Sequence, residues 1–236
     1  MSTCAAPTFT AVARTLGIIS SVCVVVLVTA YSAVLAAGLL SLGSSHEAIG
    51  DPYFSILEML ILTMMPMMVL LMICVHAWTP VAWKPFSLAS VIFMGSLAVV
   101  TSSVHFVTLS MNSAPDFVAQ PLFSLLFTFH WPSIPYALEI LGWDVFFALS
   151  MLFAAPGFGG GRLVNSIRIL MIVSGVLALA GLFGPIVGDM RFRMIGVVGY
   201  TLIFPIIALL LGSLFYRFEP TPNLHISDEG ICPINK

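Results

Sequence analysis

Six long apolar runs constrain this chain more than any other feature, because each is long enough to cross a lipid bilayer. A membrane-spanning helix needs about 20 predominantly apolar residues. The runs lie at about residues 16–42, 54–78, 86–111, 134–154, 166–187 and 195–216. The sequence therefore predicts an all-α fold, a polytopic integral membrane protein built as a bundle of six transmembrane helices.

The composition agrees with a membrane protein and excludes a nucleic-acid-binding one. Hydrophobic residues make up 60% of the 236-residue chain and charged residues 8%, whereas a soluble domain has about 25% charged residues. Eight basic and ten acidic residues leave a formal charge of -2, so no basic patch is large enough for nucleic acid. The four cysteines form no C-x-x-C pair, and neither a metal cluster nor a disulfide framework is expected.

The breaks between the runs are short and rich in turn residues, with one exception. Between the third and fourth runs, residues 116–132 are mostly apolar but too short and too interrupted to span a membrane. This pattern predicts an interfacial or re-entrant segment between helices 3 and 4. We expect one transmembrane domain over residues 1–216, followed by a polar, cytoplasmic C-terminal tail over residues 217–236.

The distribution of basic residues predicts the orientation, because cytoplasmic loops are enriched in Lys and Arg. If the N-terminus is cytoplasmic, six basic residues fall on the inner side and two on the outer side. The inner six are Arg14, Lys84, Arg162, Arg168, Arg217 and Lys236, and the outer two are Arg191 and Arg193. Both termini are therefore predicted to be cytoplasmic.

Two features inside the runs predict helix distortion and close packing. Pro66 and Pro205 each lie within a run, where a proline removes a backbone donor and kinks its helix. Methionines surround Pro66, and we interpret them as adaptable core packing. In the fifth run, Ser174 and Ala178 have the small-xxx-small spacing that suits close helix–helix contact.

The fourth run carries two carboxylates, Glu139 and Asp144, at membrane depth. A carboxylate at the helix centre costs about 2.5–3.5 kcal/mol of insertion free energy, so such residues need partners inside the bundle and mark candidate functional sites. The two lie five residues apart, about 140° around a helix, and should have different partners. We expect Glu139 to meet Glu58 or His105, and Asp144 to meet a hydroxyl or a backbone group freed by a proline.

Three of these polar residues fall at a common depth on consecutive runs. The helix rise places Glu58, His105 and Glu139 about 6–9 Å below the outer ends of their helices. On the third run, Thr101 and Thr108 flank His105 at helical spacing and complete a polar stripe. The predicted ligand- or ion-binding residues are Glu58, Thr101, His105, Glu139, Asp144 and Tyr200.

Two carboxylates and an imidazole in a dry site either share protons or hold a cation between them. The favoured interpretation is a site that binds or translocates a small ion or an amphipathic ligand. If the ion is a metal, Glu58, His105 and Glu139 are its expected ligands. No Ser/His/Asp order and no H-E-x-x-H motif is present, which favours binding over catalysis.

Two alternatives remain open from the sequence. The first alternative is a membrane-embedded acid–base enzyme that acts on a lipid-like substrate. The second is an accessory subunit whose polar groups satisfy one another or contact a partner chain. The expected partners are therefore the lipid bilayer and, under the second alternative, a partner subunit or a second copy of this chain. His76 lies near the inner end of the second run, so a haem held by His76 and His105 at one centre is not expected. No family resemblance or motif names a substrate or a cofactor.

Overall fold

The computed structural model describes residues 9–42, 49–112 and 131–218, and all regular structure within them is helical. Six helical segments are long enough and apolar enough to cross a membrane. They are Ala11–Leu40, Tyr53–Trp78, Val81–Met111, Ile134–Gly157, Arg162–Val187 and Met190–Arg217. The predicted number of helices with this length and apolar character is confirmed. The interfacial segment expected before residue 131 and the tail from residue 219 lie outside the described residues.

The first two spans are single α-helices, and the other four combine several helical elements. Spans one and two are α1 (Ala11–Leu40) and α2 (Tyr53–Trp78), and span three joins η1 (Val81–Trp83) to α3 (Lys84–Asn112). Span four consists of α6 (Ile134–Ile140), η2 (Leu141–Phe147), α7 (Ala148–Ala154) and η3 (Ala155–Gly157). Span five joins α8 (Arg162–Ala180) to α9 (Phe183–Val187). Span six consists of η4 (Met190–Arg193), α10 (Met194–Val198), η5 (Gly199–Ile203) and α11 (Phe204–Arg217).

Capping residues determine where two of the spans begin. The Thr10 side chain accepts a hydrogen bond of 3.2 Å from the backbone N–H of Ala13, which starts α1 earlier than the predicted residue 16. Ser133 caps α6 in the same way and accepts from the backbone N–H of Tyr136 at 3.2 Å. Both side chains satisfy a backbone donor that the first helical turn leaves without a partner.

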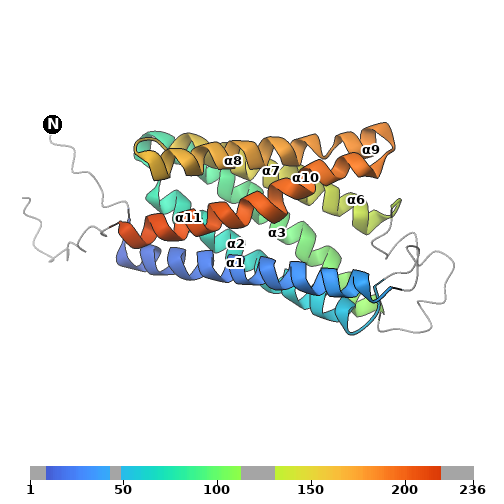
Figure 1. Ribbon diagram of the computed structural model, residues 1–236. Coiled ribbons are helices and arrows are strands. Elements are labelled where there is room, and N and C mark those ends of the chain that lie inside the picture. The colour runs from blue at the N-terminus through green and yellow to red at the C-terminus, as the bar shows by residue number, and fades with distance from the viewer. Residues whose placement is uncertain (1–8, 43–48, 113–130, 219–236) are drawn as a thin grey trace, which may run out of the picture.

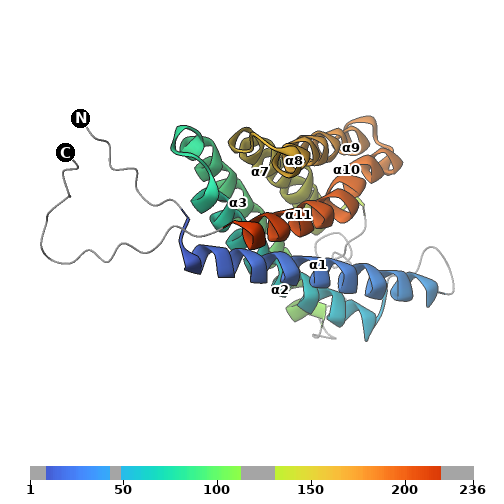
Figure 2. The same cartoon turned by 60° about the vertical axis from the view of Figure 1, so that its left-hand side comes forward.

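The six spans form a closed ring of neighbours. Each span packs on the next one along the chain, and α11 returns to pack against α1. Figure 1 shows α11 beside α1, and Figure 2, turned by 60°, shows α1 and α2 side by side. The two ends of the described chain meet at one end of the bundle, where Arg14 Nε and Nη2 donate to the carbonyl oxygens of Phe215 and Tyr216 at 3.0 and 2.7 Å.

Large apolar side chains fill the interior of the ring. Met65, Met68 and Leu71 of α2 are at most 1% exposed, and the rings of Phe147 and Phe204 meet edge to face with centroids 5.1 Å apart. The methionines around Pro66 are therefore core residues, as the sequence predicted. Apolar side chains also cover the outside of the bundle, as a bilayer-facing surface requires.

The two prolines within spans differ in their effect. The helix α2 runs unbroken through Pro66, whereas Pro205 stands in the first turn of α11, directly after the π-helical segment η5. A second π-helical segment, η2, interrupts span four without a proline and was not predicted. Single π turns inside α-helices are rare and frequently lie at functional sites.

The small residues of span five make the close contact that their spacing predicted. Ser174 Oγ donates to the carbonyl oxygen of Gly199 at 2.9 Å. A Cβ added to Gly199 would lie 2.8 Å from the Ser174 carbonyl oxygen, and one added to Gly196 would lie 3.2 Å from the Ala178 carbonyl oxygen. The backbones of spans five and six therefore approach at a distance that only glycine permits.

A pair of glycine substitutions tests this packing. We expect Gly199→Ala to destabilise the protein by about 1–3 kcal/mol, because the added methyl meets backbone that cannot move aside. Gly95 is the matched control, since it lies in the middle of α3 with nothing within 4 Å of an added Cβ. Gly95→Ala should be neutral or stabilising by up to about 1 kcal/mol. Equal unfolding midpoints for the two variants in detergent would contradict the packing argument.

Candidate functional site

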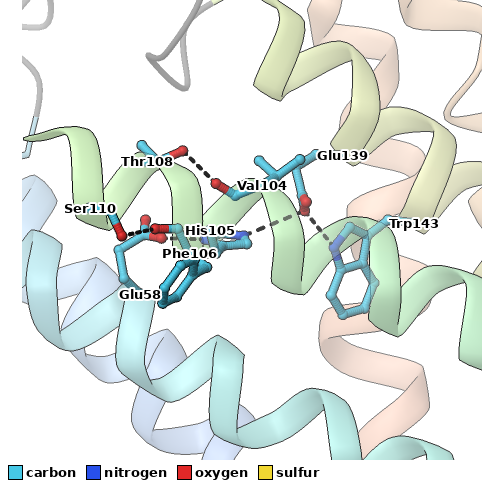
Figure 3. A network of polar contacts seen from close by, with 8 residues as sticks. All are labelled: Glu58, Val104, His105, Phe106, Thr108, Ser110, Glu139 and Trp143. Carbon is cyan, nitrogen blue, oxygen red and sulfur yellow. Dashed lines mark hydrogen bonds and ion pairs between the residues drawn. The ribbon is translucent and has the colours of Figure 1, made fainter.

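Three of the predicted residues meet inside the bundle at the end away from the described chain ends. Glu58 of α2, His105 of α3 and Glu139 of α6 are 3%, 5% and 8% exposed. His105 Nδ1 lies 2.7 Å from Glu58 Oε2, and His105 Nε2 lies 3.7 Å from Glu139 Oε2. Figure 3 shows the imidazole between the two carboxylates. Helix depth alone was therefore sufficient to predict that these three side chains converge.

The arrangement is a chain of pairs, not a cage. The two imidazole nitrogens lie on opposite edges of the ring, and each faces one carboxylate, so the three side chains do not surround a single point. Among the described residues, no group of three or more His, Cys, Asp or Glu side chains is placed to hold a metal ion. The three residues expected as metal ligands are thus arranged to exchange hydrogen bonds.

The net charge of these three side chains depends on how many protons they hold. With the imidazole protonated and both carboxyl groups ionised, Glu58, His105 and Glu139 carry one net negative charge, and one further proton makes them neutral. An unbalanced charge among buried groups is costly, whereas a neutral set of hydrogen-bonded groups is not. The geometry is therefore suited to gaining and losing a proton.

Trp143 holds the carboxylate of Glu139 in place. Its indole Nε1 donates to Glu139 Oε2 at 2.8 Å, and this contact is drawn in Figure 3. Trp143 is 8% exposed and lies in the π segment η2, one turn beyond Glu139. Trp143 was not among the predicted site residues, although an aromatic donor four positions after a carboxylate in an apolar run was a signal in the sequence.

Tyr200 reaches the site through this tryptophan. The Tyr200 and Trp143 rings have centroids 4.9 Å apart, and Tyr200 also meets Phe147 edge to face at 6.0 Å. Trp143 belongs to η2 and Tyr200 to η5. The two π-helical segments are therefore in contact, and the contact residue on one side is bonded to Glu139.

The polar stripe of α3 is buried along its whole predicted length. Thr101, His105 and Thr108 are 0%, 5% and 3% exposed. The Thr108 hydroxyl donates to the carbonyl oxygen of Val104 at 2.7 Å (Figure 3), so it is satisfied within its own helix. Thr101 Oγ1 has no hydrogen-bond partner in the described part of the chain.

Asp144 belongs to a second polar cluster and does not join the first. It is fully buried, and its Oδ2 lies 3.3 Å from Nε of Arg193, which is 9% exposed. The guanidinium carbon also lies 4.5 Å from the ring centre of Tyr136, a cation–π contact. The expectation that Asp144 meets a hydroxyl or a freed backbone group was wrong, because a buried carboxylate is better balanced by a charge than by a neutral donor.

Arg193 lies at the same end of the bundle as Arg191, where its position in the sequence was expected to place it, but its burial was not predicted. Arg191 is exposed there, with 93% of its side chain accessible. Arg193 lies in the first turn of span six and turns inward to the carboxylate of Asp144 in span four. Asp144 could have indicated that an arginine is buried, because a carboxylate inside an apolar run requires a cation. Arg191 and Arg193 were the nearest candidates at the outer end.

His76 lies at the opposite end of the bundle, as its position in the second run predicted. Its Nδ1 is 2.8 Å from Ser87 Oγ, and its carbonyl oxygen accepts from Lys84 Nζ. The ammonium of Lys84 also donates to the carbonyl oxygen of Ala77 at 3.2 Å. These contacts satisfy the C-terminal carbonyl groups of α2 and give His76 a structural setting.

Comparison with known proteins finds no matching family model, no matching curated protein and no matching solved structure. The described part of the chain has six helices long and apolar enough to cross a membrane, which suggests a membrane protein, and buried Glu/His pairs lie among them. Its function has to be argued from the chemistry of the site.

Removal of the buried arginine should be costly. Arg193→Gln leaves the fully buried Asp144 without its ion pair, and stranding one partner of a buried pair costs about 3–5 kcal/mol of folding stability. Arg191→Gln is the matched control, because that side chain is exposed and makes only a surface contact with Asp189. We expect a large fall in the unfolding midpoint for the first variant and no measurable change for the second. Similar midpoints would show that the Asp144–Arg193 pair is not a buried ion pair in the folded protein.

Proposed function

We propose that this membrane protein binds a proton reversibly at the Glu58–His105–Glu139 chain, and that proton binding underlies translocation or sensing of a small ion. The observation that carries the proposal is the buried imidazole held between two carboxylates at 2.7 and 3.7 Å. Ionisable groups at membrane depth are expensive to insert and commonly form proton relays.

A proton fits this site better than the other ligands considered. A metal ion needs several ligand atoms directed at one point, and the three side chains instead face one another in sequence. An amphipathic ligand needs an open polar cavity, whereas Glu58, His105 and Glu139 are all less than a tenth exposed. A proton needs only groups that can exchange it, and the three side chains provide those groups.

The two π segments give the protonation state a route to the rest of the bundle. Glu139 accepts from Trp143, and Trp143 packs against Tyr200 of span six. A change in the charge of Glu139 alters the strength of the indole hydrogen bond, since bonds to a charged acceptor are stronger. Because π turns break the regular helical hydrogen bonding, spans four and six are the elements best suited to respond.

The test follows the titration of the site directly. We expect the ¹⁵N signals of His105, recorded with the protein in lipid nanodiscs, to change with pH. They should change differently in Glu139→Gln and Glu58→Gln, because each of these carboxylates faces one nitrogen of the imidazole. His76→Gln is the control, since His76 is bonded to Ser87 at the other end of the bundle; it should leave the His105 titration unaltered.

Other outcomes would favour the alternatives. A His105 signal that stays constant over the whole pH range in which the protein remains folded would contradict proton binding and favour an accessory, structural role. Turnover of a lipid-like substrate with a bell-shaped pH dependence that His105→Gln abolishes would favour the enzyme. Folding of each variant must be checked first, because removal of one buried partner can destabilise the protein.

We also propose that both termini are cytoplasmic, that residues 1–216 form the transmembrane domain and that residues 217–236 form a cytoplasmic tail. Arg193 is buried, so Arg191 is the one exposed basic residue among the described residues at the end opposite Arg217. This strengthens the charge asymmetry on which the orientation depends. The lipid bilayer is the expected surrounding, and a second copy or a partner subunit remains compatible with the proposal.

Cysteine labelling tests the orientation. On a background without the natural cysteines, we expect Arg191→Cys to react with an impermeant thiol reagent in intact cells, and Arg217→Cys to react only after the membrane is disrupted. The two positions serve as controls for each other, because both side chains are exposed at opposite ends of one span. The reverse pattern would show that the termini are external.

A further inference from the structure

Four buried side-chain atoms have no hydrogen-bond partner among the described residues. They are Ser21 Oγ, Thr101 Oγ1, Glu139 Oε1 and Asp144 Oδ1. Buried polar atoms are nearly always bonded in native proteins, so each exception requires an explanation. Ser21 lies between α1 and α11, and Asp144 Oδ1 faces the glycines of spans five and six, but the remaining two atoms belong to one interface.

Thr101 and Glu139 lie on facing sides of α3 and span four. A Cβ added to Gly142 would be 3.3 Å from Thr101 Oγ1, so the hydroxyl faces the π segment η2. Gly142 lies one turn beyond Glu139, and Thr101 lies one turn before His105, whose Nε2 is 3.7 Å from Glu139 Oε2. The Thr101 hydroxyl therefore stands one turn deeper than the His105–Glu139 contact, at the same interface.

The Thr101 hydroxyl behaves differently from its neighbour on the stripe. Thr108 donates to the carbonyl oxygen four residues earlier, which is the usual solution for a threonine in a membrane helix. The Thr101 hydroxyl makes no such bond and keeps one donor and two acceptor positions. Glu139 contributes an oxygen that accepts when ionised and donates when protonated.

The chemistry of this pair of atoms selects the ligand. One hydroxyl and one carboxylate oxygen are too few for Ca²⁺ or Mg²⁺, which take about six or more oxygen ligands. A water molecule needs about two to four hydrogen bonds, and it can donate to Glu139 Oε1 while it donates to or accepts from the Thr101 hydroxyl.

We propose that a single buried water molecule binds between Thr101 Oγ1 and Glu139 Oε1 and extends the Glu58–His105–Glu139 chain one turn deeper into the bundle. The inference rests on the proposed function in one respect, namely that this water is the partner through which Glu139 Oε1 responds to protonation. The Thr101 hydroxyl is then a positioning group for the water, and its effect reaches Glu139 through it.

The experiment compares three threonine variants of the full-length protein in lipid. pH-induced infrared difference spectra are recorded in H₂¹⁶O and H₂¹⁸O, and the carboxyl band of Glu139 is identified by its loss in Glu139→Gln. We expect Thr101→Val to remove the water band that shifts in H₂¹⁸O and to move the Glu139 carboxyl band to higher frequency, because a hydrogen bond is lost. Thr101→Ser should retain both features.

Thr108→Val is the matched control. This variant has the same substitution on the same buried stripe. The Thr108 hydroxyl that it removes is already bonded to the carbonyl oxygen of Val104, so the spectra should equal those of the unchanged protein. Where the unchanged protein gives a pH-induced difference spectrum, an identical spectrum for Thr101→Val would overturn the water site. Equal shifts for Thr101→Val and Thr108→Val would overturn it as well.

Failure of the water site can be told apart from failure of the proposed function. If His105 titrates normally but Thr101→Val has no spectral effect, the proton site stands and the water site is wrong. If no group titrates, stability still decides about the water. A buried hydroxyl without a hydrogen bond destabilises the folded protein, so its removal in Thr101→Val would raise the unfolding midpoint, and that result would overturn the water site. A lower midpoint would support a hydroxyl that is bonded to water.

Discussion

The structure depends on one constraint, that every charge placed inside an apolar bundle must be balanced within reach of its own side chain. Each deeply buried carboxylate among the described residues has a basic or aromatic donor from another turn or another span. These contacts join α2 to α3, α3 to span four, and span four to span six. The polar contacts therefore supply specific pairings in a bundle whose other contacts are largely apolar and less selective.

The π segment of span four is where the two polar clusters come closest along the chain. Glu139 stands just before η2, and Trp143 and Asp144 lie within it. Glu139 turns to α3 and its neighbour Trp143, while Asp144 turns to Arg193 of span six. The two polar side chains of this short π segment thus point to different partners, Trp143 to Glu139 and Asp144 to Arg193, and a regular helix of the same sequence would direct them differently.

The outline of this arrangement could be predicted from the sequence, and its irregularities could not. Run length and hydrophobicity predicted the spans, because the bilayer imposes a length on each helix, and helix rise brought Glu58, His105 and Glu139 to one level. The burial of Arg193 and the indole bond of Trp143 depend on how far two spans are offset and rotated. Those quantities are set by packing of whole helices, such as the close approach at Gly199, which no single run encodes.

The contact between Arg14 and the last turn of α11 has a consequence for the order of assembly. The guanidinium of Arg14 contacts Phe215 and Tyr216, which lie 201 and 202 positions further along the chain. The ring of spans closes at this contact. Because a chain is synthesised from its N-terminus, α1 is made well before α11, which covers one of its sides. Closure of the ring therefore has to wait until the last helix has been synthesised.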